Sequence, residues 1–597
     1  MPPSVRTLLV LAYFGLLAWG FARVLKAHGL RRLERVLGAW LLVWLSLVLS
    51  GGVCAIFSRL GDGVWYFGLN ALTALGLQGV FLLLAKVGGV AGLGPESAGG
   101  WAARSRWDRG VVLGCLGAFA VGLVLVTAIG WWHGPTLDDC LACKLPRTGF
   151  FALHGNILPP EGWSNTRIFG APPYCSMLQL PFWIAGADVA SYNLLGSVTW
   201  LLMAAAVALS ARACGAAPPG SALAAFCFSF SALILQKGSS ENDDLLSSLP
   251  TVLSVYFFLT ACAEKSLGRF LVGGVAFGLA LGGKLLALYF AAPFVVIWLW
   301  YFAKESPDAR WQLGRGALAF GSAALLAAAV FFAQNWFMYG FPLPRSTLIE
   351  MNRNTPFQVG TFAYNVAGQT LACLASAPMN VAALLESCGL LSREALDAFV
   401  AGADRSIGAA VLDHLSRVPA PSGGDFSIAP YIMAQTFDPM RELNESNNSF
   451  GILALALPCA VLWLRRGPNR LALVFAALGL LGFLQYCATF KFILQTTRYF
   501  TPFVALGMPA FALLADRCVA DRHRWWARGL TGLAVLYTVV FAVPAWWHGR
   551  DRQIQRLVEQ VGRAPLPVER DTAPKLQEFL RTEPKVNVLD TYELPFF

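Results

Sequence analysis

Charged residues are scarce in this sequence. Only 13% of its 597 residues are Asp, Glu, Lys or Arg, and 56% are hydrophobic, whereas soluble domains carry about 25% charged residues. So few charges cannot cover a surface in water, which excludes a soluble enzyme, a disordered protein and a coiled coil. The mean hydropathy of +0.57 agrees. Long uncharged runs favour membrane-spanning helices over β-barrel strands, in which apolar and polar residues alternate.

Several signature motifs are also missing. The sequence has no Walker motif, no dinucleotide-binding fingerprint and no HExxH zinc-protease motif. Cys140 and Cys143 form one CxxC, but no second Cys/His pair follows at metal-ligand spacing, so a zinc site has weak support. The basic loops are too short to form a nucleotide-sugar-binding domain.

Apolar runs near the length of a membrane span recur along the chain. We count about fourteen of them, some short, against the ~20 residues that a span requires. They lie at 7–23, 37–57, 64–86, 110–132, 189–211, 219–236, 245–263, 268–283, 285–303, 316–334, 450–464, 471–490, 499–515 and 529–547. The sequence therefore predicts an all-α polytopic membrane protein.

Basic residues gather in the loops after the first, third, ninth, eleventh and thirteenth runs. All five loops fall on one side of the membrane, which the positive-inside rule makes cytoplasmic. This topology accounts for the net charge of +11 without nucleic acid as a partner. The long segments 133–188, 335–449 and 548–597 fall on the opposite, extracytoplasmic side, where we expect the protein to act.

The runs and loops also predict the domain organisation. The first three spans form an extension to which the sequence assigns no role. The predicted parts are the extension 1–109, a core 110–334 with the outer loop 133–188, an extracytoplasmic insertion 335–449, C-terminal transmembrane helices 450–547 and an extracytoplasmic tail 548–597.

Two acidic groups lie at the outer ends of predicted spans. Asp138 and Asp139 directly follow the fourth run. Nearby apolar surface can raise a carboxyl pKa, which suits a general base or a sugar-binding carboxylate; the alternative is the solvated start of a loop. Glu241, Asp243 and Asp244 lie in a short turn between two spans. They could line a substrate site, cap the next helix, or do both.

Cations also occur on the predicted outer side. Lys284 divides one long apolar stretch into two spans, and Arg498 opens the thirteenth run, with Lys491 just upstream. A charge so close to the hydrocarbon needs a partner, and a phosphate suits both Lys and Arg. The alternative is interfacial anchoring of long side chains. His154 shares the outer loop with Asp138 and could supply a further polar contact.

In their order and their placement on one face, these motifs resemble those of the GT-C glycosyltransferases, polytopic enzymes that use polyprenyl-phosphate sugars. The nearest likeness is to the protein O-mannosyltransferase and aminoarabinose transferase branch, over about 110–546. The matching segments are 138–139, 169–174, 242–244, 278–284, 335–342 and 498–502. One departure is Gly170-Ala171, where the aminoarabinose branch has an acidic-basic pair before its two prolines.

The resemblance implies an inverting transfer from a polyprenyl-phosphate sugar to a protein, lipid or glycan acceptor, on the periplasmic face of a bacterial inner membrane. Asp138 would take the acceptor proton, and Asp139 would orient the acceptor or the sugar. Lys284 and Arg498 would stabilise the charge growing on the departing lipid phosphate. Carboxylates at these positions could hold a divalent metal, but we expect neither a metal nor another cofactor.

Two other classes remain as alternatives. One is a transporter or lipid flippase, and the other is a cell-envelope polysaccharide polymerase or ligase. Transporters commonly show paired halves and intramembrane charges, whereas this sequence shows no internal repeat and its acids lie at the membrane surface. The acidic pairs favour the glycosyltransferase over the polymerase.

Overall fold

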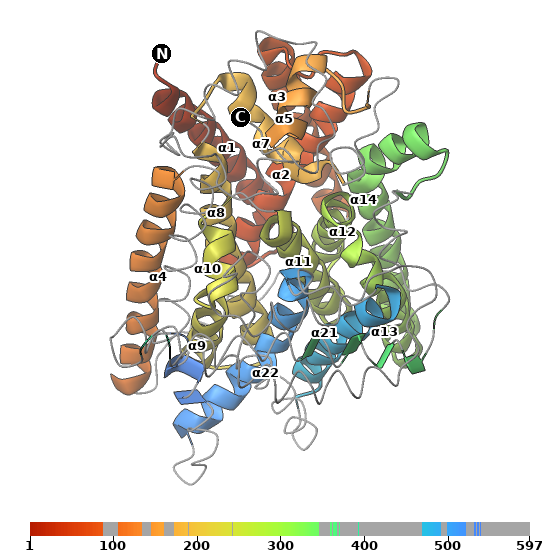
Figure 1. Cartoon of the computed structure of the whole chain (residues 1–597). Helices are drawn as coiled ribbons and strands as arrows, with labels where there is room; N and C mark the ends of the chain where they lie inside the picture. The colour runs from red at the N-terminus through yellow and green to blue at the C-terminus, as the bar shows by residue number, and fades with distance from the viewer. Residues whose placement is uncertain are drawn as a thin grey trace.

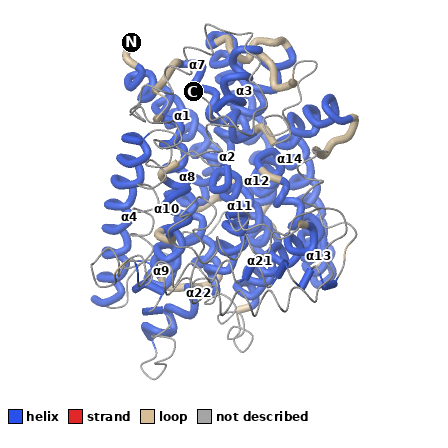
Figure 2. The backbone as a smooth tube through the Cα atoms, viewed as in Figure 1, coloured by secondary structure: helices blue, strands red, loops and turns tan. Residues whose placement is uncertain are grey.

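The computed structural model describes eight ranges of the chain, with a few single positions between 357 and 394 and between 531 and 538. The ranges are 1–87, 106–133, 145–159, 172–188, 190–240, 243–344, 469–490 and 498–520. Within them every regular element is a helix (Figures 1 and 2). The predicted tail 548–597 and nearly all of the predicted insertion lie outside these ranges.

Sixteen helices are described along the chain. They are α1 (Pro3–Ala27), α2 (Arg32–Ile56), α3 (Gly63–Val87), α4 (Arg106–His133), α5 (Leu145–His154), α7 (Tyr174–Ala185), α8 (Ser191–Ala213), α9 (Pro218–Ser229), α10 (Ala232–Gly238), α11 (Asp243–Glu264), α12 (Leu267–Gly283), η3 (Leu285–Phe290), α13 (Ala291–Lys304), α14 (Pro307–Tyr339), α21 (Arg470–Thr489) and α22 (Thr501–Ala520). The short helices α5 and α7 lie at the end of the bundle that also holds the N-terminus, at the top of Figure 1.

Ten helical stretches in the described ranges are long and apolar enough to cross a membrane. This finding confirms the prediction of an all-α polytopic membrane protein. The predicted run at 268–283 is the shorter apolar helix α12. The run at 450–464 lies outside the described residues, as does most of the run at 529–547.

The predicted run at 219–236 is divided into α9 and α10. At the end of α9, two backbone carbonyls accept hydrogen bonds from side chains, and the helix ends there. The indole Nε1 of Trp200 donates to the Ser229 carbonyl at 2.7 Å, and the Ser231 hydroxyl donates to the Phe228 carbonyl at 2.8 Å. These bonds satisfy carbonyl groups that a helix break would otherwise leave unpaired inside the bundle.

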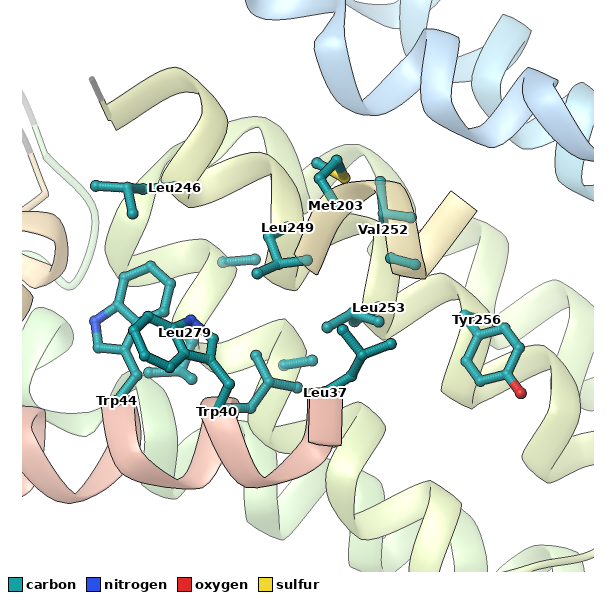
Figure 3. Packing of buried hydrophobic residues seen from close by; sticks show 14 of the residues in the cluster. Leu37, Trp40, Trp44, Met203, Leu246, Leu249, Val252, Leu253, Tyr256 and Leu279 are labelled. Atoms are coloured by element: carbon teal, nitrogen blue, oxygen red, sulfur yellow. The ribbon is translucent and has the colours of Figure 1, made fainter. Parts of the chain in front are cut away.

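Helix α2 lies in the interior of the bundle, whereas α1 and α3 expose much of their surface. In the most apolar window of α2, 78% of residues are buried, against 33% for α1 and 22% for α3. Figure 3 shows Leu37, Trp40 and Trp44 of α2 pointing toward Leu249 of α11 and Leu279 of α12. The predicted N-terminal extension therefore supplies a central helix of the bundle.

Helices α12 and α14 pack closely because α12 presents glycines to its neighbour. A Cβ atom at Gly274 would overlap the carbonyl of Phe320, and one at Gly278 would overlap the carbonyl of Ala324. Small residues allow such approach between membrane helices. At the end of α12 the backbone of Lys284 is extended, with φ −158° and ψ 141°, and η3 begins at the next residue. The chain breaks at Lys284 as predicted, although α12, the helix before the break, is shorter than the expected span.

An ionic network with a buried Arg269–Glu34 pair at its centre joins α2, α11 and α12, and we call it the Glu34 cluster. Its members are Arg31, Glu34, Tyr256, Glu264 and Arg269. Arg269 donates to both carboxylate oxygens of Glu34, at 2.8 and 3.1 Å, and to Glu264 at 2.5 Å. The Tyr256 hydroxyl and the Arg31 backbone N–H each donate to Glu34 at 2.7 Å.

Candidate functional site

A second group of buried charges lies at the opposite ends of α11 and α12, and we call it the Asp244 cluster. Its members are Arg147, Lys237, Asp243, Asp244, Lys284 and Arg498. Because α11 has 22 residues, its two ends are about 33 Å apart, close to the thickness of a bilayer core. The two clusters therefore mark the two ends of the bundle.

Asp244 contacts three cations from three separate segments. Its Oδ2 lies 3.2 Å from Nζ of Lys237 on α10 and 3.7 Å from Nε of Arg498, just before α22. Its Oδ1 forms an ion pair with Lys284 at the junction of α12 and η3. One carboxylate in the first turn of α11 thus fixes the relative positions of three cationic side chains.

Asp243 has a cation of its own. Nη2 of Arg147, on α5, lies 3.3 Å from Oδ2 of Asp243. Nε of the same arginine donates to the Ser176 hydroxyl on α7 at 2.7 Å. Only 2% of the Arg147 side chain is exposed. The short helices α5 and α7 therefore hold a guanidinium against the start of α11.

The position of Asp243 and Asp244 is compatible with both roles considered for the 241–244 turn, which are helix capping and substrate binding. Asp243 and Asp244 lie in the first turn, where the helix dipole favours negative charge. A role in stabilising the helix start accounts for their position on α11. It does not account for the cations brought to them from α5, α10, the end of α12 and the start of α22.

The cations of the cluster differ in exposure. The Lys237 side chain is fully buried, whereas those of Lys284 and Arg498 are 23% and 15% exposed. The ring of Tyr499 lies beside both exposed cations, 3.9 Å from Nζ of Lys284 and 5.3 Å from Cζ of Arg498. Lys284 and Arg498 are therefore the members placed to meet a ligand, and an aromatic face supports their positive charge.

Positive charge exceeds negative charge among the described members of the Asp244 cluster. Four cations surround two carboxylates. The partly exposed cations Lys284 and Arg498 suit an anionic ligand. An arginine offers two parallel donors to a phosphate, and a lysine offers a compact positive charge.

Sequence reasoning identified Asp243, Asp244, Lys284 and Arg498 as candidates, and the structure brings these four together. It missed Arg147 and Lys237, whose partners in the cluster come from other helices. A signal existed for Lys237, since it directly follows an apolar run and precedes the acidic turn. Arg147 gave none, because its partner Asp243 lies 96 positions away.

The other predicted site residues divide into two sets. Asp138, Asp139, Glu241 and Lys491 lie outside the described residues, so their roles stay predictions. His154 ends α5 and stacks on Phe150, with ring centroids 4.1 Å apart. Partial burial lowers the pKa of His154, which favours the neutral imidazole.

The described residues contain no group of three His, Cys, Asp or Glu side chains that could hold a metal ion. Asp243 and Asp244 are instead engaged with cations.

No family model matches this chain, and no curated protein sequence matches it. Two solved structures of the Archaeoglobus fulgidus oligosaccharyltransferase are similar to the model. The apo form has a TM-score of 0.44 and 14% identity, over 83% of this chain and 62% of the other. The complex with Zn and sulfate has a TM-score of 0.39 and 12% identity, over 80% of this chain and 58% of the other. The matched part is thus under two thirds of the archaeal enzyme's length.

Proposed function

We propose that this protein is an integral-membrane glycosyltransferase of the GT-C type. It transfers a sugar from a polyprenyl-phosphate donor to an acceptor on the extracytoplasmic face of a bacterial inner membrane. The observation that supports this proposal most directly is the placing of Lys284 and Arg498 around Asp244, beside the ring of Tyr499. The order of the sequence motifs supports it independently.

A lipid phosphate fits this cluster in charge and in setting. Lys284 and Arg498 are partly exposed, and both lie against the ring of Tyr499. From Lys284 the chain continues through η3 into α13, where Val295 and Val296 are exposed. An apolar tail can lie along this surface while its phosphate reaches the two cations. A free nucleotide sugar would not use such a surface.

The reaction is a single displacement. The acceptor hydroxyl attacks the anomeric carbon, and the bond between that carbon and the phosphate oxygen breaks, so that the electron pair leaves with the phosphate. The carboxylate of Asp138 takes the hydroxyl proton, and the configuration inverts. Lys284 and Arg498 stabilise the charge that grows on the leaving phosphate, and this accelerates transfer if the stabilisation exceeds that of the bound donor.

Release of polyprenyl phosphate from a panel of lipid-linked sugars, by the purified full-length protein, tests this function. We expect release in step with transfer to acceptors in a membrane extract. We also expect nearly complete loss of both in Asp138→Asn at normal expression. A transporter or flippase would move the lipid intact. If the folded wild-type protein releases no polyprenyl phosphate even with membrane extract, the proposed function is wrong, and full activity of Asp138→Asn would remove that residue from its role.

A further inference from the structure

Trp44, in the interior of α2, connects the N-terminal helices to the outer end of the bundle. Its indole Nε1 donates to the backbone carbonyl of Tyr174 at 3.0 Å, and both residues are buried. Tyr174 is the first residue of α7. A helix of the N-terminal extension therefore holds the beginning of α7.

Tyr174 is fixed on two further sides. Its hydroxyl donates to the Ala327 carbonyl at 2.7 Å and accepts from the backbone N–H of Phe331 at 3.0 Å, both on α14. Its ring lies against α12, because a Cβ atom at Gly282 would overlap it. The start of α7 is thus held between α2, α12 and α14.

This position matters because two cations of the Asp244 cluster depend on it. Ser176, two residues after Tyr174, accepts from Arg147, which pairs with Asp243. Gly282, against the Tyr174 ring, stands two residues before Lys284. A displacement of the first turn of α7 would move Arg147 directly and Lys284 through α12.

We propose that Trp44 is a positioning residue for the Asp244 cluster, and that α2 is consequently part of the machinery for sugar transfer. The indole acts through the first turn of α7 and through Ser176, without touching the substrate. The activity readout of this inference rests on the proposed function. The N-terminal extension thereby acquires a role, namely to fix the geometry of cations that belong to the core.

Trp44→Phe tests the proposal, because it keeps an aromatic ring and removes only the N–H donor. The matched control is Trp40→Phe, one turn earlier on the same helix, since the Trp40 N–H has no acceptor among the described residues. We expect kcat to fall by roughly tenfold to a hundredfold in Trp44→Phe, as for a small misplacement of catalytic groups. KM for the acceptor and the melting temperature should match those of Trp40→Phe. Equal kcat in the two variants would overturn the proposal.

A double-mutant cycle examines the route through Ser176. Ser176→Ala removes the hydroxyl that accepts from Nε of Arg147. The hydrogen bond through which Trp44 would act on the Asp244 cluster is therefore absent in this variant. We expect Trp44→Phe to reduce kcat much less in the Ser176→Ala protein than in the wild type. If the double variant loses kcat by the product of the two single losses, Trp44 acts independently of Ser176 and the proposal is contradicted.

Hydrogen exchange separates failure of this inference from failure of the proposed function. In the full-length protein, Trp44→Phe should accelerate amide exchange in α5 and in the first turns of α7 more than Trp40→Phe does. This measurement needs no substrate. If the wild type transfers no sugar, the proposed function fails and exchange still decides the positioning role. If exchange at α5 and α7 is the same in both variants, the positioning role is wrong.

Discussion

The Glu34 cluster and the Asp244 cluster are both buried groups of charges, yet they are built differently. At one end of the bundle, Arg269 meets Glu34 through two parallel hydrogen bonds, and these two side chains are 1% and 0% exposed. At the other end, Asp244 meets three cations, two of which are partly exposed. We call the first cluster closed because its central pair is sealed from solvent, although its outlying members Arg31 and Glu264 are 48% and 33% exposed. We call the second open because two cations in contact with its central carboxylate are partly exposed.

Charge balance separates the clusters further. The Glu34 cluster pairs the carboxylates Glu34 and Glu264 with the guanidinium groups of Arg31 and Arg269. The described members of the Asp244 cluster comprise twice as many cations as carboxylates. Two-sided hydrogen bonding and balanced charge are what a buried ion pair needs in order to be stable. We therefore assign the Glu34 cluster to holding helices together, whereas ligand binding at the Asp244 cluster is a proposal that rests on the partly exposed Lys284 and Arg498.

The largest effect is expected from breaking the closed cluster. Glu34→Gln should lower the free energy of unfolding by about 3–5 kcal/mol, because it leaves the buried Arg269 without its bidentate carboxylate. The unfolding temperature of the solubilised protein would report this loss. Replacing both residues together, as Glu34→Met with Arg269→Met, should restore much of the stability. Unchanged stability in Glu34→Gln would contradict the structural role of this cluster.

The open cluster should respond in activity rather than in stability. Lys284→Met is expected to reduce sugar transfer by about 10²–10³-fold, the range observed when a group that stabilises transition-state charge is removed, with little change in unfolding temperature. Lys304→Met is the matched control, because Nζ of Lys304 lies 3.9 Å from the ring of Trp300, as Nζ of Lys284 does from Tyr499. Equal activity of the two variants would remove Lys284 from the site.

Asp244→Asn should affect stability and activity together, which neither previous variant does. The amide is isosteric but cannot pair with Lys237, a fully buried cation. We expect a loss of about 1–3 kcal/mol in unfolding free energy, with weaker binding of the lipid phosphate because Lys284 and Arg498 lose their common partner. Denaturant unfolding and product inhibition by polyprenyl phosphate measure the two effects. A change in binding without any change in stability would show that Asp244 does not fix Lys237.

The smallest effect is expected at the rim of the closed cluster. The NH2 group of Arg31 lies 3.5 Å from Glu264, and these side chains are 48% and 33% exposed. Exposed pairs contribute about 0–1 kcal/mol, so Arg31→Gln should change the unfolding free energy by less than ~1 kcal/mol. The backbone N–H that Arg31 donates to Glu34 survives the substitution. A loss as large as that of Glu34→Gln would mean that the rim, rather than the Arg269 pair, stabilises the cluster.

Local features of the sequence predicted the parts of the site that local features control. Lys284 interrupts an apolar stretch that is longer than one span requires, so the junction at Lys284 was predictable. The acids at 243–244 were also conspicuous, because they lie in a short turn between two apolar spans. Lys237 directly follows the predicted run 219–236 and gave a weaker signal. Arg147 looked like an ordinary loop residue, because nothing near it in the chain indicates that α5 packs beside α7.

The sequence alone determined that this chain is a bundle of membrane helices, since span length and scarcity of charge are properties of each segment by itself. Only the tertiary structure decided that Asp244 gathers cations from three segments, because Lys284 is 40 positions away and Arg498 far more distant. It also decided that α2 lies inside the bundle while α1 and α3 face outward. Lipid is as apolar as a protein core, so hydrophobicity by itself cannot tell which helix another helix covers.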